Sequence, residues 1–439
     1  MAMKDSRVPW IGEIPSEWEV IKLKYSSLLK GRIGWQGLTT DEYRSEGPYL
    51  VTGTDFNNGI VAWERCHHVS EERYQLDIAI QIKEDDLLIT KDGTIGKVAV
   101  SKNCPDKACL NSGVFIIRNN GKYKYYSRFM YYVLQSDELQ LWFSYTDRGN
   151  STVKHLTQEK FYNFSFAYPP LFEQQAIADY LDDRCFKIDE IIAEATASIE
   201  EYKELKQAVI FEAVTKGLDK NASMKDSGVE WIGEVPSKWP VTKLGRYINI
   251  LPGYAFSSSD FSKDGIPLLR GVNVTPSGVR WDDTVYWDKS TEGLEQYFLN
   301  TEDIIVGLDR PWIKEGMRTF IIKQKDIPCL LLQRVCRIRC SERVLNSFVY
   351  YWLSSKSFER ALTSETTGIS VPHISTNQIS DFKMAFPPVS EQREIVEYLN
   401  CRISDINALI SEKQALIEDL QAYKKSLIYE VVTGKRRIS

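Results

Sequence analysis

Two stretches of the chain have the hydrophobic spacing of long helices. From Pro169 to Thr215, apolar residues return at intervals of three and four, with a seven-residue repeat underneath. A helix of roughly 45 residues is about 65 Å long. Because its apolar stripe is narrow, one small globular domain cannot bury it. We therefore expect this helix to pair with another helix along a coiled-coil seam.

The same chain supplies the partner helix. Residues 387–433 align with residues 169–215 without a gap at an offset of 218, and 19 of the 47 aligned positions are identical. Both stretches begin with two prolines, followed by the pairs Glu173-Gln174 and Glu391-Gln392. The apolar residues expected at the seam, and so the candidate subunit-interface residues, are Leu181, Ile188, Ile192, Ile199, Leu399, Ile406, Ile410 and Ile417.

A second repeat lies ahead of these helices. Residues 3–23 return as residues 224–244, with 15 of 21 positions identical. The repeats divide the chain into two equivalent halves, each with this lead segment, a globular body and a long helix. Two such halves imitate a twofold dimer, so we expect antiparallel helices, with residues 435–439 returning to the first body. The predicted domains are 1–168, 169–218, 219–386 and 387–439.

The two bodies have the short β-branched and aromatic runs of strands, separated by turn residues. The predicted strands are Tyr49–Thr52, Leu87–Thr90, Val98–Val100 and Val114–Ile117 in the first body, and Leu268–Leu269, Ile304–Val306, Phe320–Ile322 and Val335–Ile338 in the second. One helix is expected in each, at Tyr125–Gln135 and Leu345–Ser354. The fold class is therefore α+β, with two strand-rich bodies of mixed structure and two long helices in an antiparallel coiled coil. Framework residues agree between the bodies while the segments between them differ, so two different recognition surfaces are expected.

Charge and composition narrow the class of protein. The formal net charge is −5, and most of the excess acid lies in the helical stretches. Residues 31–168 hold 16 basic and 17 acidic side chains, and residues 245–386 hold 17 and 16. Such bodies suit binding through a localised basic face rather than binding of any polyanion. The absence of a long apolar run and of a signal-peptide pattern predicts a cytoplasmic location, where the eight cysteines would stay reduced.

Three strings resemble catalytic or metal-binding motifs, and none has the required spacing. The string from Gly93 to Lys97 has too few residues between its glycines for a phosphate loop and no hydroxyl after the lysine. The proline pairs at 169 and 387 lack the preceding Asn or Asp of adenine methyltransferases and fit the end of a strand and the start of a helix. Cys66, His67 and His68 have no second ligand pair nearby. We therefore predict no catalytic residues, no metal and no cofactor.

Polar loops of each body are suited to contact with DNA. Glycines, hydroxyls and basic groups in a turn are what phosphate contact requires, and Arg and Asn pair with base edges in the major groove. Ordinary turns and surface ion pairs would have the same composition. The candidate DNA-binding residues are Lys91, Thr94, Lys97, Ser151, Lys154, His155, Arg270, Asn273, Arg310, Arg334, Ser370 and His373.

The duplicated MKDSxVxWIGExPSxW segment, the PPxxEQ helix start and the turn-rich bodies with KDGTIGK and GYAF resemble a specificity subunit of a type I restriction-modification system. The resemblance spans the whole chain. It implies that each body is a target recognition domain for one half of a split double-stranded DNA sequence and that the helices form the spacer. It further implies two modification subunits that methylate adenine, restriction subunits that translocate and cleave DNA, and no catalytic residues in the chain itself.

Two other functions remain open at this point. A methyltransferase or nuclease acting alone would need a methyl-donor or metal site, and a coiled-coil scaffold would have no DNA sequence preference.

Overall fold

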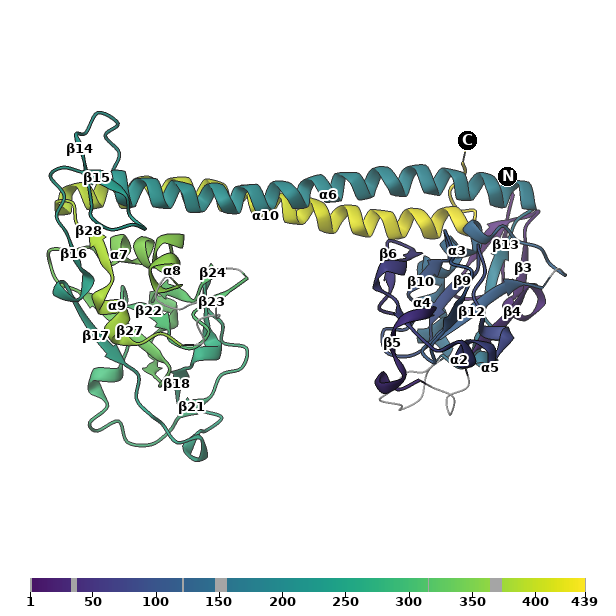
Figure 1. Ribbon diagram of the computed structural model, residues 1–439, viewed down its shortest axis with the longest axis horizontal. Helices are drawn as coiled ribbons and strands as arrows, with labels where there is room; N and C mark the ends of the chain where they lie inside the picture. Colours follow the sequence, from purple (N-terminus) through teal and green to yellow (C-terminus); the bar gives the residue numbers. More distant parts are fainter. Residues whose placement is uncertain are drawn as a thin grey trace. The chain divides into compact units, whose positions relative to one another are not determined.

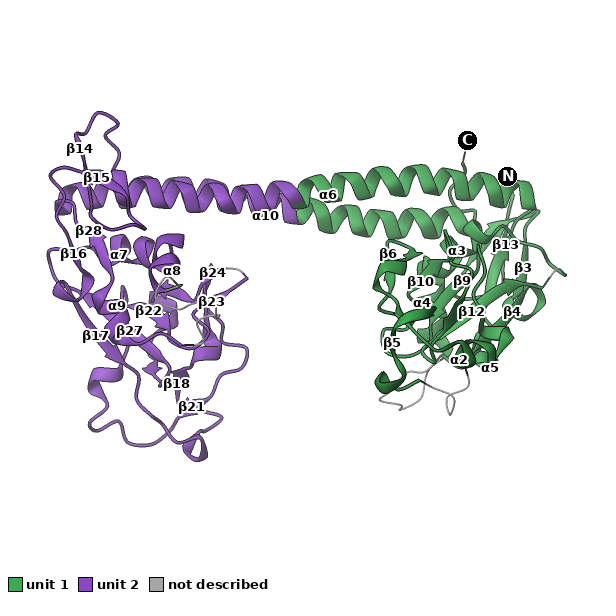
Figure 2. Ribbon diagram, in the orientation of Figure 1, with its two compact units in different colours: residues 1–196, 415–439 green, residues 197–414 purple. Residues whose placement is uncertain are grey.

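The computed structural model describes residues 2–32, 38–120, 122–146, 156–314, 316–363 and 373–438. It divides into two compact units, residues 1–196 with 415–439 (unit 1) and residues 197–414 (unit 2), as Figure 2 shows. The division crosses both long helices, α6 (Leu171–Lys216) and α10 (Val389–Val432). Each unit therefore combines one body with part of each helix, whereas the division expected from the sequence kept the helices as separate domains.

The body of unit 1 is built on a six-stranded sheet in the order β4-β12-β9-β10-β7-β6, antiparallel except for the β10–β7 pair. A second sheet has the order β11-β5-β8, and two strand pairs, β1-β2 and β13-β3, complete the unit. The strands are β1 Met3–Asp5, β2 Glu13–Pro15, β3 Glu19–Lys22, β4 Ser27–Gly31, β5 Arg44–Val51, β6 Phe56–Asn57, β7 Ile60–Val61, β8 His67–His68, β9 Leu87–Thr90, β10 Val98–Val100, β11 Ala108–Leu110, β12 Val114–Asn119 and β13 Ser165–Tyr168. The short helices are α1 Leu23–Ser26, α2 Glu71–Gln75, α3 Ser127–Gln135, α4 Asp137–Thr146 and α5 Gln158–Tyr162.

The body of unit 2 repeats this plan with a four-stranded sheet, β17-β27-β22-β25, and a three-stranded sheet, β21-β18-β26. The strands are β14 Met224–Asp226, β15 Glu234–Pro236, β16 Val241–Lys243, β17 Ile248–Pro252, β18 Ile266–Leu269, β19 Val274–Thr275, β20 Gly278–Val279, β21 Tyr286–Trp287, β22 Ile304–Gly307, β23 Trp312–Ile313, β24 Gly316–Met317, β25 Thr319–Ile321, β26 Leu330–Leu331, β27 Val335–Cys340 and β28 Lys383–Ala385. The short helices are α7 Asn346–Leu353, α8 Lys356–Thr363 and α9 Thr376–Asp381 (Figure 1).

Each main sheet lies between two apolar layers because its central strand is buried on both faces. In β9, Leu87 and Ile89 pack toward α3 and the long helices, while Leu88 packs toward the second sheet. Ile304 and Ile305 of β22 divide in the same way. Side chains alternate along a strand, so a continuous aliphatic run supplies both layers. The expected strands and the two expected body helices, α3 and α7, are all present, and α4, α5, α8 and α9 form in addition.

Each long helix begins after its proline pair and is fixed there by the repeated Glu-Gln pair. Trp18 Nε1 donates to Glu173 Oε2 at 2.9 Å, and Trp239 Nε1 donates to Glu391 Oε2 at 3.0 Å. These carboxylates lie in the first helical turn, where their negative charge also interacts favourably with the positive end of the helix dipole. The lead segments are therefore straps that hold the helix starts.

The glutamine of each pair is fully buried and links helix to body. Gln174 Nε2 donates to Pro169 O at 2.8 Å, and its Oε1 accepts from Tyr126 N at 3.0 Å. Gln392 makes the equivalent bonds to Pro387 O at 2.8 Å and from Leu345 N at 2.9 Å. A buried amide needs such partners, and in both halves the backbone just ahead of the body helix supplies one of them.

The ends of the long helices meet the straps of the other helix. Gly217 and Gly434 follow the helices with φ of 73° and 72°, the left-handed conformation that ends a helix. A Cβ at Gly434 would lie 2.5 Å from Pro15 and 3.0 Å from Trp18, and one at Gly217 would lie 3.0 Å from Trp239. Trp18 and Trp239 thus each lie against the start of one long helix and the end of the other.

The helices pair in opposite directions within each unit. In unit 1, Lys424 Nζ lies 2.6 Å from an oxygen of Asp189; in unit 2, Lys206 Nζ lies 3.0 Å from Asn407 Oδ1. These two contacts occupy equivalent positions in the repeat, with aspartate replaced by asparagine. The antiparallel pairing that the repeat predicted is confirmed.

The predicted seam lies inside the chain. Six of its residues are buried, while Ile192 and Ile410 are half-buried; the six are Leu181, Ile188, Ile199, Leu399, Ile406 and Ile417. These side chains pack within the chain, so the seam itself is not open to another subunit.

The segment after α10 returns to the first body, as the repeat predicted. Lys435 Nζ donates to Ile11 O at 2.6 Å.

All eight cysteines are free, and five are buried. None of the helices in the described part of the chain combines the length and apolar character that crossing a bilayer requires.

Among the described residues of unit 1, Glu138 of α4 is a buried carboxyl group without a hydrogen-bond partner. Both carboxyl oxygens are buried and unpaired, and burial raises the pKa of Glu138 to about 8, although the charge of Lys435 opposes this shift. The equivalent residue in unit 2 is Ser357, which is also buried. A buried carboxyl group without partners is stable only when protonated.

We expect replacement of Glu138 by Gln to remove a pH-dependent loss of stability. Below about pH 4.5 the group is protonated in folded and unfolded chains alike, and between pH 4.5 and about 8 only the unfolded chain ionises. Stability of the wild type therefore falls as pH rises through this window. The difference in free energy of unfolding between Glu138→Gln and the wild type should shift in favour of the variant by on the order of a few kcal/mol from pH 5 to pH 8. Urea unfolding at both pH values measures this, with exposed Asp137→Asn as the control. An equal pH response in Glu138→Gln and wild type would contradict the expectation.

Candidate nucleic-acid interface

Three segments of unit 2 meet at Asp309, which follows β22. Its Oδ1 lies 2.7 Å from His373 Nδ1, and its Oδ2 lies 3.1 Å from Arg334 Nη1. Backbone bonds hold the segments together, because Leu308 N donates to Arg334 O at 2.9 Å and Ile374 N to Leu308 O at 2.8 Å. One carboxylate therefore orients two exposed side chains that are far apart in sequence.

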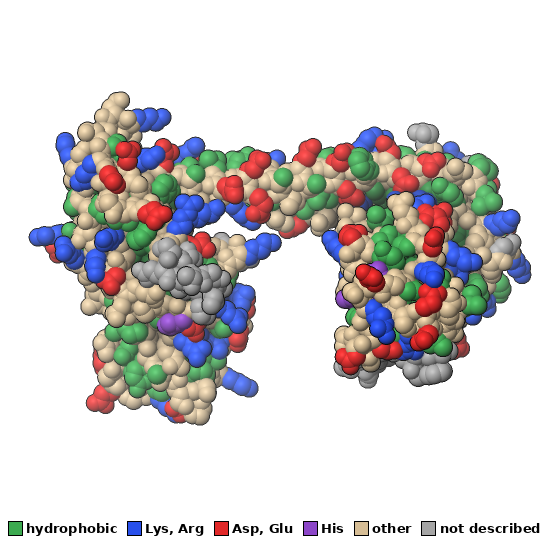
Figure 3. Space-filling model, in the orientation of Figure 1, with side chains coloured by type: hydrophobic (Ala, Val, Ile, Leu, Met, Phe, Trp, Pro, Cys, Tyr) green, Lys and Arg blue, Asp and Glu red, His purple; other side chains and the backbone are tan. Residues whose placement is uncertain are grey.

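The cationic side chains here are exposed and held in unusual backbone conformations. Arg310 and Arg334 have φ of 44° and 68°, a region that non-glycine residues adopt rarely, and the Arg334 side chain is 71% exposed. Arg310 is also exposed. Backbone strain of this kind collects at functional sites, where the surrounding structure enforces it. Figure 3 shows Lys and Arg side chains beside the histidine of unit 2.

Arg318 supports this loop from beneath. Its Nε donates to Val274 O at 2.9 Å and its Nη1 to Asp309 O at 2.8 Å. Burial lowers the pKa of the Arg318 guanidinium, and the Asp309 charge opposes that shift. Arg318 is thus a positioning residue of the loop, and the sequence did not single it out.

The structure removes Asn273 from the candidate contacts. Asn273 is 1% exposed, and its amide donates to Arg280 O and Asp283 O while its Oδ1 accepts from Arg270 N. Arg270 is itself paired with Asp283 at 3.2 Å. Both residues hold the loop between them and Asp283, so neither is left free for a base edge. In unit 1, Asp55 stabilises the matching turn by accepting from Thr52 N at 2.7 Å.

The loop between β9 and β10 is the equivalent position in unit 1. Thr90 Oγ1 donates to Thr94 O at 2.6 Å and accepts from Lys97 N at 2.9 Å, so the loop is a tight turn. Lys91 lies over the ring of Phe115 and 3.8 Å from a carboxylate oxygen of Asp92. Thr94 and Lys97 are exposed, and Lys97 lines a cleft that faces the long helices.

The loops of the two units share a frame. Leu156 N donates to Lys91 O at 3.1 Å, which matches the bond from Ile374 to Leu308. At the other end of each inner strand, a buried aspartate pairs with an arginine, Asp86 with Arg118 and Asp303 with Arg339. These backbone hydrogen bonds and ion pairs are therefore the same in both units, whereas the exposed side chains of the loops differ.

Four predicted contacts, Ser151, Lys154, His155 and Ser370, lie outside the described residues. The structure thus brings Arg334 and His373 together at Asp309, and Arg310 follows Asp309 in the chain. In the sequence, Asp309 is marked only by its alignment with Asp92, because each of these aspartates follows the inner strand of its body.

Histidines 67 and 68 are used within the fold. His68 Nδ1 lies 2.7 Å from Gly47 O, and His67 stacks on Tyr43. Across the described ranges, no group of three His, Cys, Asp or Glu residues is placed to hold a metal ion.

Comparison with known proteins gives one consistent family. The family model described as the type I restriction modification DNA specificity domain matches residues 15–201 and again residues 236–419. The two matches follow the two halves of the repeat.

Curated relatives agree with this match. The specificity subunit of the type I restriction enzyme MjaVIII from Methanocaldococcus jannaschii is 28% identical over 429 residues, which cover 97% of this chain and 94% of that protein. The EcoAI specificity subunit from Escherichia coli is 37% identical over 178 residues, which cover 40% of this chain and 30% of that protein.

Solved structures share the fold. A chain from a structural study of complex assembly and conformational transition in the type I R-M system has a TM-score of 0.72 at 15% identity, covering 96% of this chain and 99% of that chain. The HsdS subunit from Thermoanaerobacter tengcongensis has a TM-score of 0.51 at 16% identity, covering 96% and 98%. Two family matches that together span most of the sequence show that this chain belongs to the family of type I restriction-modification specificity subunits.

Proposed function

We propose that the chain recognises a bipartite DNA sequence, one half with each body, and directs the modification and restriction subunits of a type I system without catalysing a reaction itself. The observation on which the proposal rests is the shared frame with different exposed side chains. The loop after the inner strand is held by equivalent bonds in both units, yet it has Lys91 and Thr94 in unit 1 and Arg310 in unit 2. Two surfaces of this kind are suited to two different half-sites.

Family membership favours this function over the alternatives of a lone methyltransferase and of a scaffold without DNA specificity. In the proposed assembly, two modification subunits and the restriction subunits attach to the chain. The outer faces of α6 and α10 are the places for attachment that the fold leaves open, because the inner seam is already packed.

The residues of the DNA-contact group are Lys91, Thr94, Arg310, Arg334 and His373. Arg310 and Arg334 are the strongest candidates for base edges, since exposed guanidinium groups pair bidentately with guanine. Lys91 is suited to a phosphate, since its side chain is 19% exposed and fixed over Phe115.

Replacement of Arg310 by Ala should reduce discrimination at one position of one half-site by about 1 to 3 kcal/mol. Alanine retains the Cβ of arginine, so the backbone strain at this position is unchanged. Binding to a set of duplexes with single base changes measures the effect. Arg402→Ala, an equal charge change on α10, is the control. A uniform loss over all duplexes would identify a phosphate contact instead.

Exchange of one body should change one half of the target. The exchanged segment is residues 24–163, because β13 pairs with β3 and both strands should stay native. We expect the half-site of unit 1 to become that of the donor while the half-site of unit 2 is retained. Selection of bound duplexes from a randomised pool tests this, and a change in both halves, or in neither, would contradict independent recognition.

The long helices should set the gap between half-sites. A four-residue insertion after Ile199 lengthens α6 by about 6 Å, which is about two base pairs. Lengthening α6 alone would break either the Asp189–Lys424 or the Lys206–Asn407 contact, so α10 needs a matching insertion after Lys413. Four residues are close to one turn, so the apolar stripe stays in the seam.

We expect the doubly extended chain to keep both half-sites and to prefer a gap one or two base pairs longer. Affinities for duplexes that differ only in gap length give the answer. The variant extended in α6 alone serves as the comparison and should be less stable. If the preferred gap is unchanged, the helices do not set it.

A further inference from the structure

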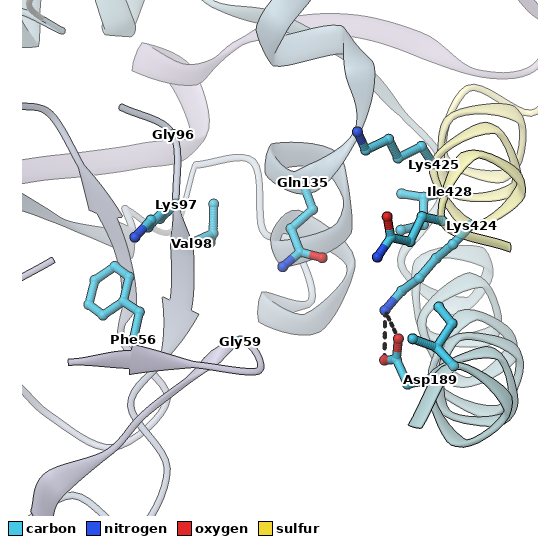
Figure 4. Close-up of a pocket in the computed structure, with 12 residues that line it drawn as sticks. Phe56, Gly59, Gly96, Lys97, Val98, Gln135, Asp189, Lys424, Lys425 and Ile428 are labelled. Carbon is cyan, nitrogen blue, oxygen red and sulfur yellow. Dashed lines mark hydrogen bonds and ion pairs between the residues drawn. The ribbon is translucent and has the colours of Figure 1, made fainter. Parts of the chain in front are cut away.

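Unit 1 contains a cleft of about 540 Å³ between its body and its helix pair. The body side is formed by Phe56, Gly59, Gly96, Lys97, Val98 and Gln135, and the helix side by Asp189, Ile192, Gln421, Lys424, Lys425 and Ile428. Figure 4 shows Gln135, at the end of α3, between the other body residues and the helix side of the cleft. Every lining residue belongs to unit 1.

The cleft has an excess of positive charge. Three lysines and one aspartate line it, and Asp189 already holds Lys424 through both carboxylate oxygens, at 2.7 and 2.6 Å. Within the described part of the chain, Lys97 and Lys425 have no ion-pair partner. Beside them lie the apolar side chains of Ile192, Ile428 and Phe56 and the amides of Gln135 and Gln421.

Unit 2 differs at the equivalent place. Gln207 of α6 occupies the position of Lys425, and Ser354 occupies that of Gln135. Gln207 Nε2 donates to Ser354 O at 3.4 Å, and its Oε1 accepts from Lys356 N at 3.1 Å. In unit 2 the helix is thus bonded directly to the junction of α7 and α8, whereas in unit 1 the same helix position holds Lys425, which has no ion-pair partner among the described residues.

The size and lining of the cleft limit what it can bind. A DNA duplex is too wide to enter a space that holds only a few side chains. Ammonium groups beside aliphatic and aromatic side chains match a peptide that combines carboxylates with apolar residues. The resulting ion pairs would be partly shielded from water, which strengthens them relative to surface pairs.

We propose that this cleft binds an acidic, partly apolar segment of a protein partner, namely the modification subunit. This inference rests on the proposed function, which supplies that partner. Because unit 2 has Gln207 in place of Lys425, the two modification subunits attach unequally, and the one at unit 1 has the additional contact.

The test is a charge series at Lys425, which is outside the DNA-contact group. The full-length chain is titrated with the purified modification subunit of the same system, and binding is measured by calorimetry and sedimentation. Lys425→Arg should retain the higher-affinity step, Lys425→Gln should weaken it about threefold, and Lys425→Glu about tenfold or more. Raising the salt concentration should reduce these differences.

Two controls distinguish the cleft from general charge effects. Lys187→Gln makes the same change on α6 of unit 1 at a residue that pairs with Asp183 outside the cleft, and it should bind like the wild type. Equal thermal unfolding of all variants excludes misfolding, and Lys425→Arg provides a conservative variant that retains the charge.

The outcomes separate the two proposals. If the wild type binds no modification subunit, the proposed function fails. If the wild type binds but the Lys425 series leaves binding unchanged, the cleft is not the docking site. If Lys425→Glu instead weakens binding of duplex DNA by the chain alone and leaves assembly intact, the cleft contacts DNA and the inference is overturned.

Discussion

The burial of Gln174 and Gln392 is the interaction on which the rest of the structure depends. Each side chain ties the first turn of a long helix to the backbone just ahead of a body helix, at 3.0 and 2.9 Å. The neighbouring glutamates bind the strap tryptophans, which also contact the end of the opposite helix. Removal of either glutamine would leave backbone groups unpaired in the interior, a cost of about 1 to 3 kcal/mol for each group. Body, strap and both helices therefore meet at one point in each unit.

This anchoring separates stability from recognition. The inner strands, the Asp–Arg pairs at the starts of these strands and the Glu-Gln pairs repeat in both units, so the frame can tolerate different side chains on the loops at the other end of the strands. Asp309 gives an example, since it uses one carboxylate to orient both Arg334 and His373 without altering the strands below. A duplicated frame with independent loops is a physical basis for a split target.

The sequence predicted the elements well because they depend on local pattern and on an internal repeat. The helix starts, the inner strands β9 and β10 and the antiparallel pairing all follow from periodicity and from the match between the halves. The sites depend on tertiary contacts, and there sequence reasoning was less successful. Asn273 has the residue type of a base contact but is buried in a turn, which no spacing reveals. Lys425 and Lys97 come from distant parts of the chain, so nothing local indicated that they share a cleft.

The composition of unit 1 has a consequence for the order of folding. Its core includes Leu427, Ile428, Val431 and Val432, so residues from both ends of the chain must meet to complete it. Unit 2 is one continuous segment, residues 197–414. During synthesis the N-terminal body leaves the ribosome first, but its partner helix leaves last, whereas unit 2 is complete before α10 ends. Unit 1 is therefore completed after unit 2, and the part of its apolar core that α10 covers stays exposed while unit 2 is made.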